Sequence, residues 1–164
     1  MFKVLIISIG EYEMAVSERA MSILREFSIE AEQVNIPSDG MVSKIEDIYG
    51  YIENSTVSVI IATAGEMPNL PSIIASRISQ LVIAIPIKST LLNGLDSLIA
   101  AVKVPVGCAS PAVAIDGGEN AGLLAAQILA ISDKDLAKKL KEYKLSMKEH
   151  VRKQNMKLKE EHNL

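Results

Sequence analysis

The sequence predicts an α/β protein: one doubly wound domain with a five-stranded parallel sheet between two layers of helices, followed by a long helical arm. Three observations support this fold class. Short runs of apolar residues, many of them β-branched, lack the alternation of a half-exposed strand and therefore indicate strands covered on both faces. Segments with helical spacing of apolar residues separate these runs. A charged helical segment, residues 133–161, is longer than the core of one such domain requires.

The predicted strands and helices follow one another without an internal repeat or a linker. The strands are residues 4–7, 30–36, 57–62, 81–87 and 107–115. The helices are residues 14–27, a segment carrying Ile45, Ile48 and Ile52, a helix that begins near Pro71, and residues 90–102, 121–130 and 133–161. We assign residues 1–132 to the α/β domain and residues 133–164 to an arm that packs on a neighbouring subunit.

Composition narrows the class of protein. An apolar content of 49% and a mean hydropathy of +0.25 are high, and such a surplus is typical of chains that cover apolar surface in an oligomer. The net charge of −3 gives no general attraction to nucleic acid, and no apolar run reaches the roughly 18 residues of a membrane span. A first strand this early leaves no room for a signal peptide, and a single cysteine fits a reducing compartment. We therefore expect a cytoplasmic oligomer.

The strongest candidate for a binding site is the loop after the third strand, residues 62–71, which reads ATAGEMPNLP. In open parallel sheets, ligands bind at the carboxyl ends of the strands. The small residues Ala64 and Gly65 let a ligand approach the backbone closely, while Glu66 and Asn69 add a carboxylate and an amide. Two prolines stiffen the loop, as suits a preformed pocket. The alternative interpretation is a tight strand-to-helix turn without a ligand.

Three other strand ends carry weaker signals. Residues 10–13 precede the first helix, where free backbone N–H groups commonly bind anions, although two glutamates there equally suit helix capping. Lys88 and Ser89 close the fourth strand, and Lys88 either neutralises an anionic ligand or is solvated. Residues 116–120 could cradle a phosphate or cap a helix, but they lack the lysine and hydroxyl of a P-loop. Neither the two histidines nor Cys108 belongs to a cluster with metal-ligand spacing, so we expect no metal.

Four motifs, in this order along the chain, resemble one known family. They are ATAGEMPNLP at residues 62–71, LNGLDSL at 92–98, VPVG at 104–107 and GENAGLLAAQIL at 118–129. The family is that of N5-carboxyaminoimidazole ribonucleotide mutase (PurE), whose other branch is aminoimidazole ribonucleotide carboxylase. The resemblance implies a flavodoxin-like three-layer fold and a homo-octamer with active sites at subunit contacts. It also implies transfer of a carboxylate to ring carbon C4 of an imidazole ribonucleotide in purine biosynthesis, without a metal or organic cofactor.

The chain departs from the family pattern at its reactive positions. Where the family has Gly-Ser-x-Ser-Asp for the phosphate and ribose, residues 9–13 read IGEYE, and only Glu13 keeps an acid. Where the family has Ser-Ala-His-Arg, residues 37–40 read PSDG, so Asp39 stands in for the histidine that acts as acid and base. Asn69 replaces a family histidine in the loop after the third strand. Loss of a positioned acid or base typically lowers a rate by about 10²–10⁴.

The resemblance implies a site made from the same loops. Asp39 and Asn69 are expected to be catalytic. The expected substrate-binding residues are Gly10, Glu11, Glu13, Ser38, Ala64, Gly65, Glu66, Leu70, Lys88 and Ser89. The expected function is carboxylate transfer on a small ribonucleotide by a divergent enzyme of this family. One alternative is a non-catalytic relative that binds a ribonucleotide, and another is a carboxylase of a different ring, such as the nicotinate-nucleotide carboxylases that share this fold.

Overall fold

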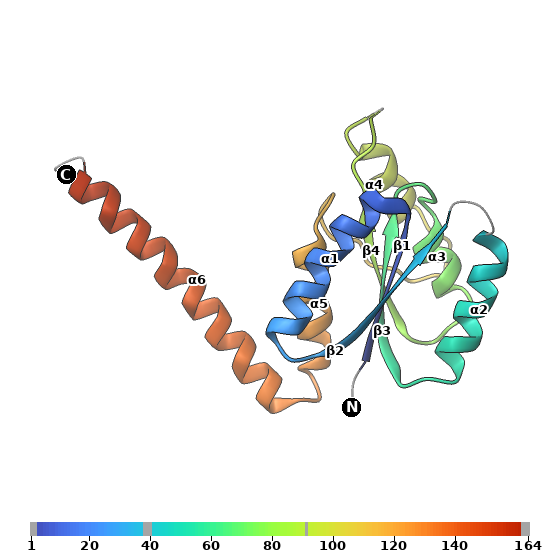
Figure 1. The fold of residues 1–164 in the computed structure, drawn as a ribbon, viewed down its shortest axis with the longest axis horizontal. Coiled ribbons are helices and arrows are strands. Elements are labelled where there is room, and N and C mark those ends of the chain that lie inside the picture. Colours follow the sequence, from blue (N-terminus) through green and yellow to red (C-terminus); the bar gives the residue numbers. More distant parts are fainter. Residues whose placement is uncertain (1–2, 38–40, 91, 162–164) are drawn as a thin grey trace. The chain divides into compact units, whose positions relative to one another are not determined.

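The computed structural model describes residues 3–37, 41–90 and 92–161, and its strands and helices alternate along the chain (Figure 1). The strands are β1 (Lys3–Ile9), β2 (Glu30–Ile36), β3 (Val57–Ala64) and β4 (Leu81–Pro86). The helices are α1 (Gly10–Glu26), α2 (Met41–Glu53), α3 (Leu70–Ala75), α4 (Leu95–Val102), α5 (Gly118–Leu129) and α6 (Lys134–Glu161). The expected α/β class is therefore confirmed.

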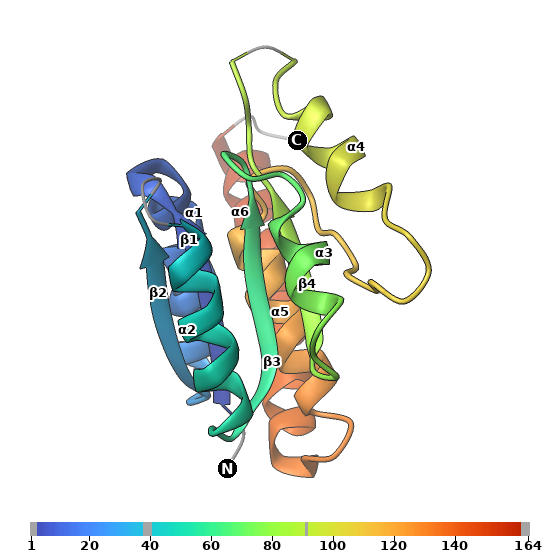
Figure 2. The same ribbon diagram turned by 90° about the vertical axis from the view of Figure 1, so that its right-hand side faces the viewer.

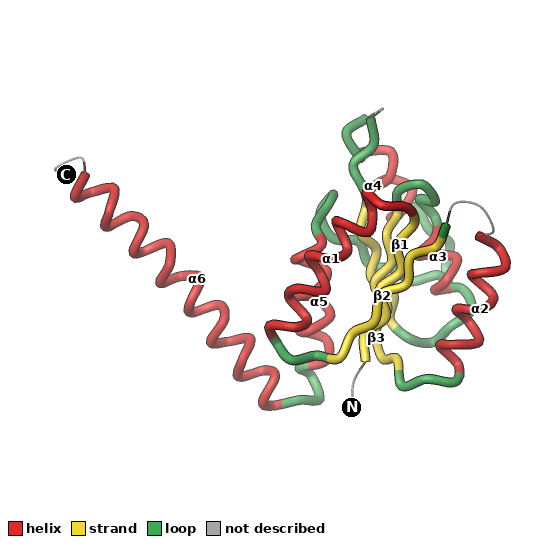
Figure 3. Tube along the Cα trace, viewed as in Figure 1, coloured by secondary structure: helices red, strands yellow, loops and turns green. Residues whose placement is uncertain are grey.

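The four strands form one parallel sheet in the order β2-β1-β3-β4. The chain moves outward from β1 to β2 and then crosses back over β1 to β3, which is the doubly wound connectivity. Figures 1 and 2 show α1 and the start of α5 on one face of the sheet, with α2 and α3 on the other. The carboxyl ends of β1, β3 and β4 therefore meet at one edge, where Figure 3 shows the strands continuing into loops or helices.

The core occupies both faces of the sheet because the central strands carry runs of consecutive apolar side chains, residues 4–7 in β1 and 59–62 in β3. Leu5 and Ile7 of β1 pack with Ile60 of β3 and with side chains of α2 and α3. Val4 and Ile6, which alternate with Leu5 and Ile7 along β1, are also fully buried, and successive side chains of a strand point to opposite faces. Burial of one such side chain contributes about 1.5–3 kcal/mol. The absence of alternation in the sequence therefore reports two covered faces, as expected.

The expected fifth strand is wrong in detail: the described residues form four strands, and residues 107–115 make a single bridge beside β4, between Ala84 and Ala112. The Ala84 N–H donates to the Pro111 carbonyl at 2.9 Å, and the Val113 N–H donates to the Ala84 carbonyl at 3.0 Å. The ladder does not extend because Pro111 has no N–H and because Cys108 is held in a turn by its 3.2 Å hydrogen bond to the Pro105 carbonyl.

The starts of α1 and α4 differ most from the prediction. Helix α1 begins at Gly10, so residues 10–13 form its first turn rather than a loop before residue 14. Helix α4 begins at Leu95 instead of residue 90, because Gly94 adopts a left-handed conformation (φ 90°) and ends a turn that starts at Ser89. Both changes bring polar side chains of the first helical turn to the edge of the sheet.

The chain divides into two compact units, Met1–Ala125 and Ala126–Leu164. In the second unit, α6 starts beside Asp133, whose Oδ1 accepts hydrogen bonds from the N–H groups of Asp135 and Leu136 at 3.0 Å each. This is an N-cap, which satisfies two of the unpaired donors at the helix start. Leu136 and Leu140 are buried, whereas the apolar residues from Leu145 onward are about half exposed.

Within the part of the chain that the structure describes, no helix combines the length and the apolar character that crossing a bilayer requires.

A hydrogen-bonded group at the edge of the sheet links stability to pH. Lys3 Nζ lies 2.7 Å from Glu32 Oε2 and 2.5 Å from the Tyr51 hydroxyl, and Tyr51 donates to Glu32 at 2.6 Å. The hydrogen bond from Lys3, followed by that from Tyr51, holds the pKa of Glu32 below its usual value of 4.5. The ionised carboxylate therefore stabilises the folded state.

We expect Glu32→Gln to lower the free energy of unfolding slightly at neutral pH, because this partly exposed group loses its charge. The folded-state pKa lies below the unfolded one, so the contribution of Glu32 is complete above the unfolded value. It is lost as the pH falls through the folded value. Urea denaturation of both proteins at several pH values measures the difference. The difference in free energy of unfolding between the wild type and Glu32→Gln should become smaller as the pH falls. At neutral pH it should exceed the difference caused by the control Glu30→Gln, which removes a 3.9 Å ion pair with Lys3. A difference that does not change with pH contradicts the expectation.

Candidate functional site

A pocket of about 270 Å³ lies at the carboxyl edge of the sheet, where β1, β3 and β4 end. Its walls come from the first turn of α1, the loop after β3, the segment after β4 and the first turn of α4. The lining residues are Ile9, Tyr12, Glu13, Gly65, Glu66, Ile87, Lys88, Ser89, Thr90, Asp96 and Ser97. This is the position at which an open parallel sheet binds its ligands.

The back of the pocket is organised by the carboxylate of Glu13, which is only 3% exposed. Its Oε2 accepts hydrogen bonds from the Ile9 N–H at 3.1 Å and from the Thr63 hydroxyl. Its Oε1 accepts the N–H of Glu66 at 2.6 Å. Three donors from β1, β3 and the following loop therefore converge on one buried carboxylate, which is how such a group is kept in a protein interior.

Gly65 lies against this carboxylate at the turn after β3. A Cβ atom added there would overlap Glu13 Oε1 and would lie 2.9 Å from the Cβ of Ile87. The loop can therefore come this close to Glu13 only with glycine at position 65. The close approach brings the N–H of Glu66 into hydrogen-bond range of Glu13.

Asp116, in the loop before α5, holds two of the lining residues in place. Its Oδ2 accepts the Tyr12 hydroxyl at 3.1 Å, and its Oδ1 accepts the backbone N–H of Lys88 at 2.8 Å. Its carbonyl accepts a hydrogen bond from Arg19 at 2.8 Å. Partial burial, followed by the hydrogen bond to Asp116, raises the pKa of the Tyr12 phenol above its usual value of 10.0, so Tyr12 is a neutral donor.

The wall formed by α4 contains a second short hydrogen-bonded pair. The Ser89 hydroxyl donates to Asp96 Oδ1 at 2.6 Å, and Ser89 Oγ accepts the N–H groups of Leu92 and Gly94 at 3.3 Å each. The hydrogen bond from Ser89 is the largest influence on Asp96 and lowers the pKa of this carboxyl below its usual 3.8. Asp96 is therefore an ionised acceptor at the mouth of the pocket at neutral pH.

The structure brings together five of the residues that the sequence assigned to substrate binding: Glu13, Gly65, Glu66, Lys88 and Ser89 line the pocket. Gly10 lies next to it, since a Cβ on Gly10 would be 3.0 Å from Glu66 Oε1. Glu11 is exposed in the first turn of α1, and Ala64 is buried in β3.

The other assigned residues lie elsewhere or outside the described ranges. Asn69 is exposed at the start of α3, where its carbonyl accepts the Ile73 N–H at 3.0 Å. Leu70 is fully buried in the core cluster between the sheet, α2 and α3. Ser38 and Asp39 are not among the residues that the structure describes.

The sequence assignment did not include several pocket residues, among them Tyr12, Thr90, Asp96 and Ser97. Asp96 and Ser97 belong to the LNGLDSL motif, so the motif itself carried a signal for them. Tyr12 follows Glu11 in the first turn of α1 and could have been found from its place at a strand end. Among the described residues, no group of three or more His, Cys, Asp or Glu is arranged to hold a metal ion.

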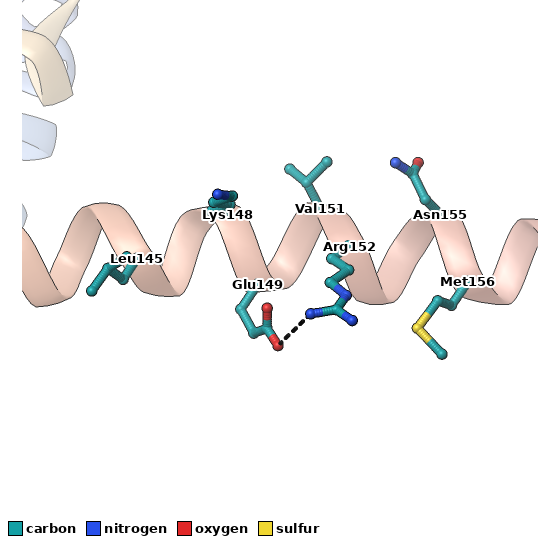
Figure 4. A pocket seen from close by; sticks show the side chains of 7 residues that line it. All are labelled: Leu145, Lys148, Glu149, Val151, Arg152, Asn155 and Met156. Atoms are coloured by element: carbon teal, nitrogen blue, oxygen red, sulfur yellow. Dashed lines mark ion pairs between the residues drawn. The ribbon is translucent and has the colours of Figure 1, made fainter.

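A larger hollow, of about 690 Å³, lies along α6. All seven lining side chains come from consecutive turns of this one helix, and Figure 4 shows them projecting from it, with Glu149 and Arg152 paired at 4.0 Å. Because these side chains have no opposing wall within their own helix, the hollow is a surface groove. The pocket at the sheet edge is therefore the candidate site.

Comparison with known proteins identifies relatives of the chain. A protein-family model described as AIR carboxylase matches residues 3–150. A Methanocaldococcus jannaschii protein named N5-carboxyaminoimidazole ribonucleotide mutase is 39% identical over 151 residues, which cover 92% of this chain and 94% of the relative. A Thermotoga maritima protein of the same name is 38% identical over 142 residues, covering 87% and 83%. The crystal structure of Treponema denticola PurE2-S38D superposes with a TM-score of 0.84 and 25% identity, covering 97% of this chain and 99% of that one.

Proposed function

This chain belongs to the AIR carboxylase family, and on that premise we propose that it converts N5-carboxyaminoimidazole ribonucleotide to 4-carboxy-5-aminoimidazole ribonucleotide, or acts on a related ribonucleotide, in purine biosynthesis. The observation that carries the proposal is the similarity to two proteins named as this mutase over more than four fifths of the chain. The pocket at the carboxyl edge of the sheet supports it, since this edge serves as the ligand site in open α/β folds.

The reaction is an isomerisation that balances without a co-reactant. The bond between the exocyclic nitrogen and the carboxylate breaks, a bond from that carboxylate to ring carbon C4 forms, and the C4 proton ends on the nitrogen. A group that accepts and returns this proton is required, as is a site that limits access of water. We assign the proton transfer to Asp39, with Asn69 as a second catalytic group, and substrate contacts to Glu66, Lys88 and Ser89.

Glu13 has a different role in this proposal from the one that the family pattern suggests. Both of its carboxylate oxygens already accept hydrogen bonds from the chain. We therefore propose that Glu13 mainly holds the loop at Gly65 and Glu66 in place. A ribose hydroxyl that contacts Glu13 would donate to an oxygen that already accepts a hydrogen bond from the chain. Of the rest of the assigned set, Gly10, Glu11, Ser38 and Ala64 are proposed to shape the same region, whereas Leu70 is proposed to support the loop after β3 from the core.

We propose that the protein acts as a cytoplasmic homo-octamer with its active sites at subunit contacts. Support comes from apolar side chains on and beside α4, all of them at least half exposed. These are Leu92, Leu95, Ile99, Val102 and Val106. Such a patch is typical of a surface that another subunit covers. In the same proposal residues 133–164 are an arm that packs on a neighbouring subunit, and sedimentation analysis of the intact protein would measure the number of subunits.

Turnover of N5-carboxyaminoimidazole ribonucleotide by the purified protein tests the proposed function, with formation of the 4-carboxylated product followed spectrophotometrically. We expect measurable turnover, and we expect Asp39→Asn to reduce kcat by about 10²–10⁴, because a positioned acid and base is lost. Asp47→Asn is the matched control, since Asp47 is an exposed acid of α2 that forms an ion pair with Lys44 at 3.6 Å. No turnover at high enzyme concentration contradicts the function and favours the non-catalytic alternative, while equal rates for the wild type and Asp39→Asn contradict the role of Asp39.

A further inference from the structure

We propose that α6 docks on the acidic surface of residues 1–125 in a second copy of the chain, through an apolar stripe that lysines flank on both sides. The inference rests on the oligomer in the proposed function and is independent of the proposed reaction. It adds which face of the helix makes the contact, which surface receives it and why that surface is preferred. Its basis is the distribution of apolar and charged side chains around this one helix.

An apolar stripe runs along most of α6. Its successive members are separated by three, four or seven positions, which places them on one side of a helix with 3.6 residues per turn. The members are Leu136, Leu140, Tyr143, Met147, Val151 and Leu158. Because the pattern returns after eleven residues, from Leu136 to Met147 to Leu158, the stripe stays on one side of a nearly straight helix.

The stripe begins as protein core and continues as exposed surface. Leu136 and Leu140 are 6% and 7% exposed, whereas Met147, Val151 and Leu158 are 52–54% exposed. A continuous apolar face of this kind on a charged helix is typical of a surface that a partner covers. The part of the stripe from Met147 onward is therefore available for docking.

Lysines lie along both flanks of this stripe, as their positions on the helix show. They are Lys144 and Lys148 on one flank and Lys139 and Lys157 on the other. The acids Glu142 and Glu149 lie on the opposite face of α6. Figure 4 shows Lys148 on the same side of the helix as Val151, with Glu149 on the other side. The surface that receives the stripe is therefore expected to be apolar at its centre and acidic around it.

The first unit of the chain has the complementary charge. Residues 1–125 contain seven Lys and Arg against fourteen Asp and Glu, a net charge of −7, whereas residues 126–164 contain ten against six, a net charge of +4. Exposed acids lie along α1, β2 and α2. They are Glu11, Glu18, Glu26, Glu30, Glu46, Asp47 and Glu53. The helix of one copy and the first unit of another therefore attract each other.

Two other occupants of the stripe fit these charges less well. Two copies of α6 that face each other through their stripes would bring lysine flanks together, and like charges in contact oppose association. A lipid surface with anionic headgroups would attract the lysines, but it would repel residues 1–125, which leave the whole chain at −3. A second copy offers acidic surface together with the exposed apolar residues on and beside α4. It is therefore the occupant that the observations favour.

Methionine oxidation of the intact protein tests the docking, because α6 contains a matched pair of side chains. Met147 belongs to the stripe and Met156 to the opposite face, and they are 53% and 54% exposed in the single chain. We expect dilute hydrogen peroxide, followed by mass spectrometry, to oxidise Met147 at least about threefold more slowly than Met156 at low salt. The ratio should fall in 1 M NaCl, because the Debye length is then about 3 Å instead of about 10 Å at 0.1 M.

Equal oxidation rates at low salt in a protein that sediments as an oligomer overturn the inference and leave the proposed function in place. A protein that sediments as a monomer overturns the inference together with the proposed oligomer. Protection of Met147 that appears only after vesicles of phosphatidylserine are added would show a lipid occupant and also overturns it. Turnover of the ribonucleotide is measured separately and is not affected by any of these outcomes.

Zero-length coupling with a carbodiimide, which joins a lysine to an Asp or Glu in direct contact, identifies the surface that α6 contacts. The oligomer is assembled from isotope-labelled and unlabelled chains, so that a crosslink between copies joins one labelled and one unlabelled peptide. We expect such crosslinks to join Lys144, Lys148 or Lys157 to acids of residues 1–125. Crosslinks between copies that join α6 only to α6 would show that the helices pair with each other and overturn the inference.

Charge-reversed variants test the role of the lysines. Lys144→Glu combined with Lys157→Glu changes one lysine on each flank, and we expect it to raise the oxidation rate of Met147 relative to Met156 by about threefold or more. Lys138→Glu combined with Lys153→Glu makes the same change in charge at exposed positions away from the stripe and should leave the ratio as in the wild type.

The corresponding Lys144→Gln and Lys157→Gln variant removes the two charges without adding acids to the helix, and it should change the ratio in the same direction. Far-UV circular dichroism checks that α6 is retained in each variant. Equal ratios in the flank variants and in the control overturn the electrostatic argument.

Discussion

Replacing Glu13 by alanine is expected to lower the free energy of unfolding by about 2–4 kcal/mol. The change removes the acceptor of the Ile9 N–H, the Thr63 hydroxyl and the Glu66 N–H, and leaving a buried donor unpaired costs roughly 1–3 kcal/mol. We expect a loss at the lower end of the sum of these costs, because the Thr63 hydroxyl can still donate to the Ile7 carbonyl, which lies 3.4 Å away. Urea denaturation at one fixed protein concentration measures the loss, which is independent of any ligand.

Two milder variants separate the hydrogen bonds of Glu13 from the space that it fills. Glu13→Gln keeps the volume and one carbonyl oxygen but places an amide group against a donor, so we expect about half the loss seen with alanine. Thr63→Val removes the hydroxyl that donates to Glu13 Oε2 and so removes that one hydrogen bond. Thr63→Ser retains the hydroxyl and is the control. Equal stabilities for wild type and Glu13→Ala would mean that the carboxylate does not hold the loop at Gly65 and Glu66.

This network also marks the limit of what the sequence could predict about the candidate site. The carboxyl ends of parallel strands share one edge of the sheet, so the rule that ligands bind at strand ends predicted which segments meet. Glu13, Gly65 and Lys88 do lie around one pocket. The rule could not predict that Glu13 turns inward to Thr63, fifty positions away along the chain. That direction depends on the distance between β1 and β3 and on the missing side chain at Gly65.

The fold was more predictable than the site because burial on both faces of a strand leaves a direct mark on the sequence. The strands β1, β3 and β4 were found for this reason. Residues 107–115 show the converse: they are apolar enough for a strand, yet Pro111 lacks the N–H that a longer ladder needs. The hydropathy of a segment predicts whether it is buried. Whether it also forms a strand depends on the backbone N–H groups that are available to bond with the neighbouring strand.

The start of α5 carries the other large effect on stability, and we expect Gly118→Ala to lower the free energy of unfolding by about 3 kcal/mol. A Cβ atom on Gly118 would overlap the Val16 carbonyl oxygen of α1 and would lie 3.1 Å from the Cβ of Arg19. The Val16 oxygen belongs to the backbone of α1, and the Cβ of Arg19 is fixed to that backbone, so neither atom can rotate away as the end of a side chain can. The helices must therefore separate, and overpacking of this kind typically costs about 1–3 kcal/mol and occasionally more.

Gly50→Ala is the matched control because it makes the same chemical change in a helix, at a position where an added Cβ has no neighbour within 4 Å. There we expect the free energy of unfolding to rise by about 0.5–1 kcal/mol, since alanine reduces the conformational entropy of the unfolded chain. Thermal or urea unfolding of both variants at equal concentration should give shifts of opposite sign. Shifts of the same sign would contradict the close packing of α5 on α1, because helix propensity alone would then explain both results.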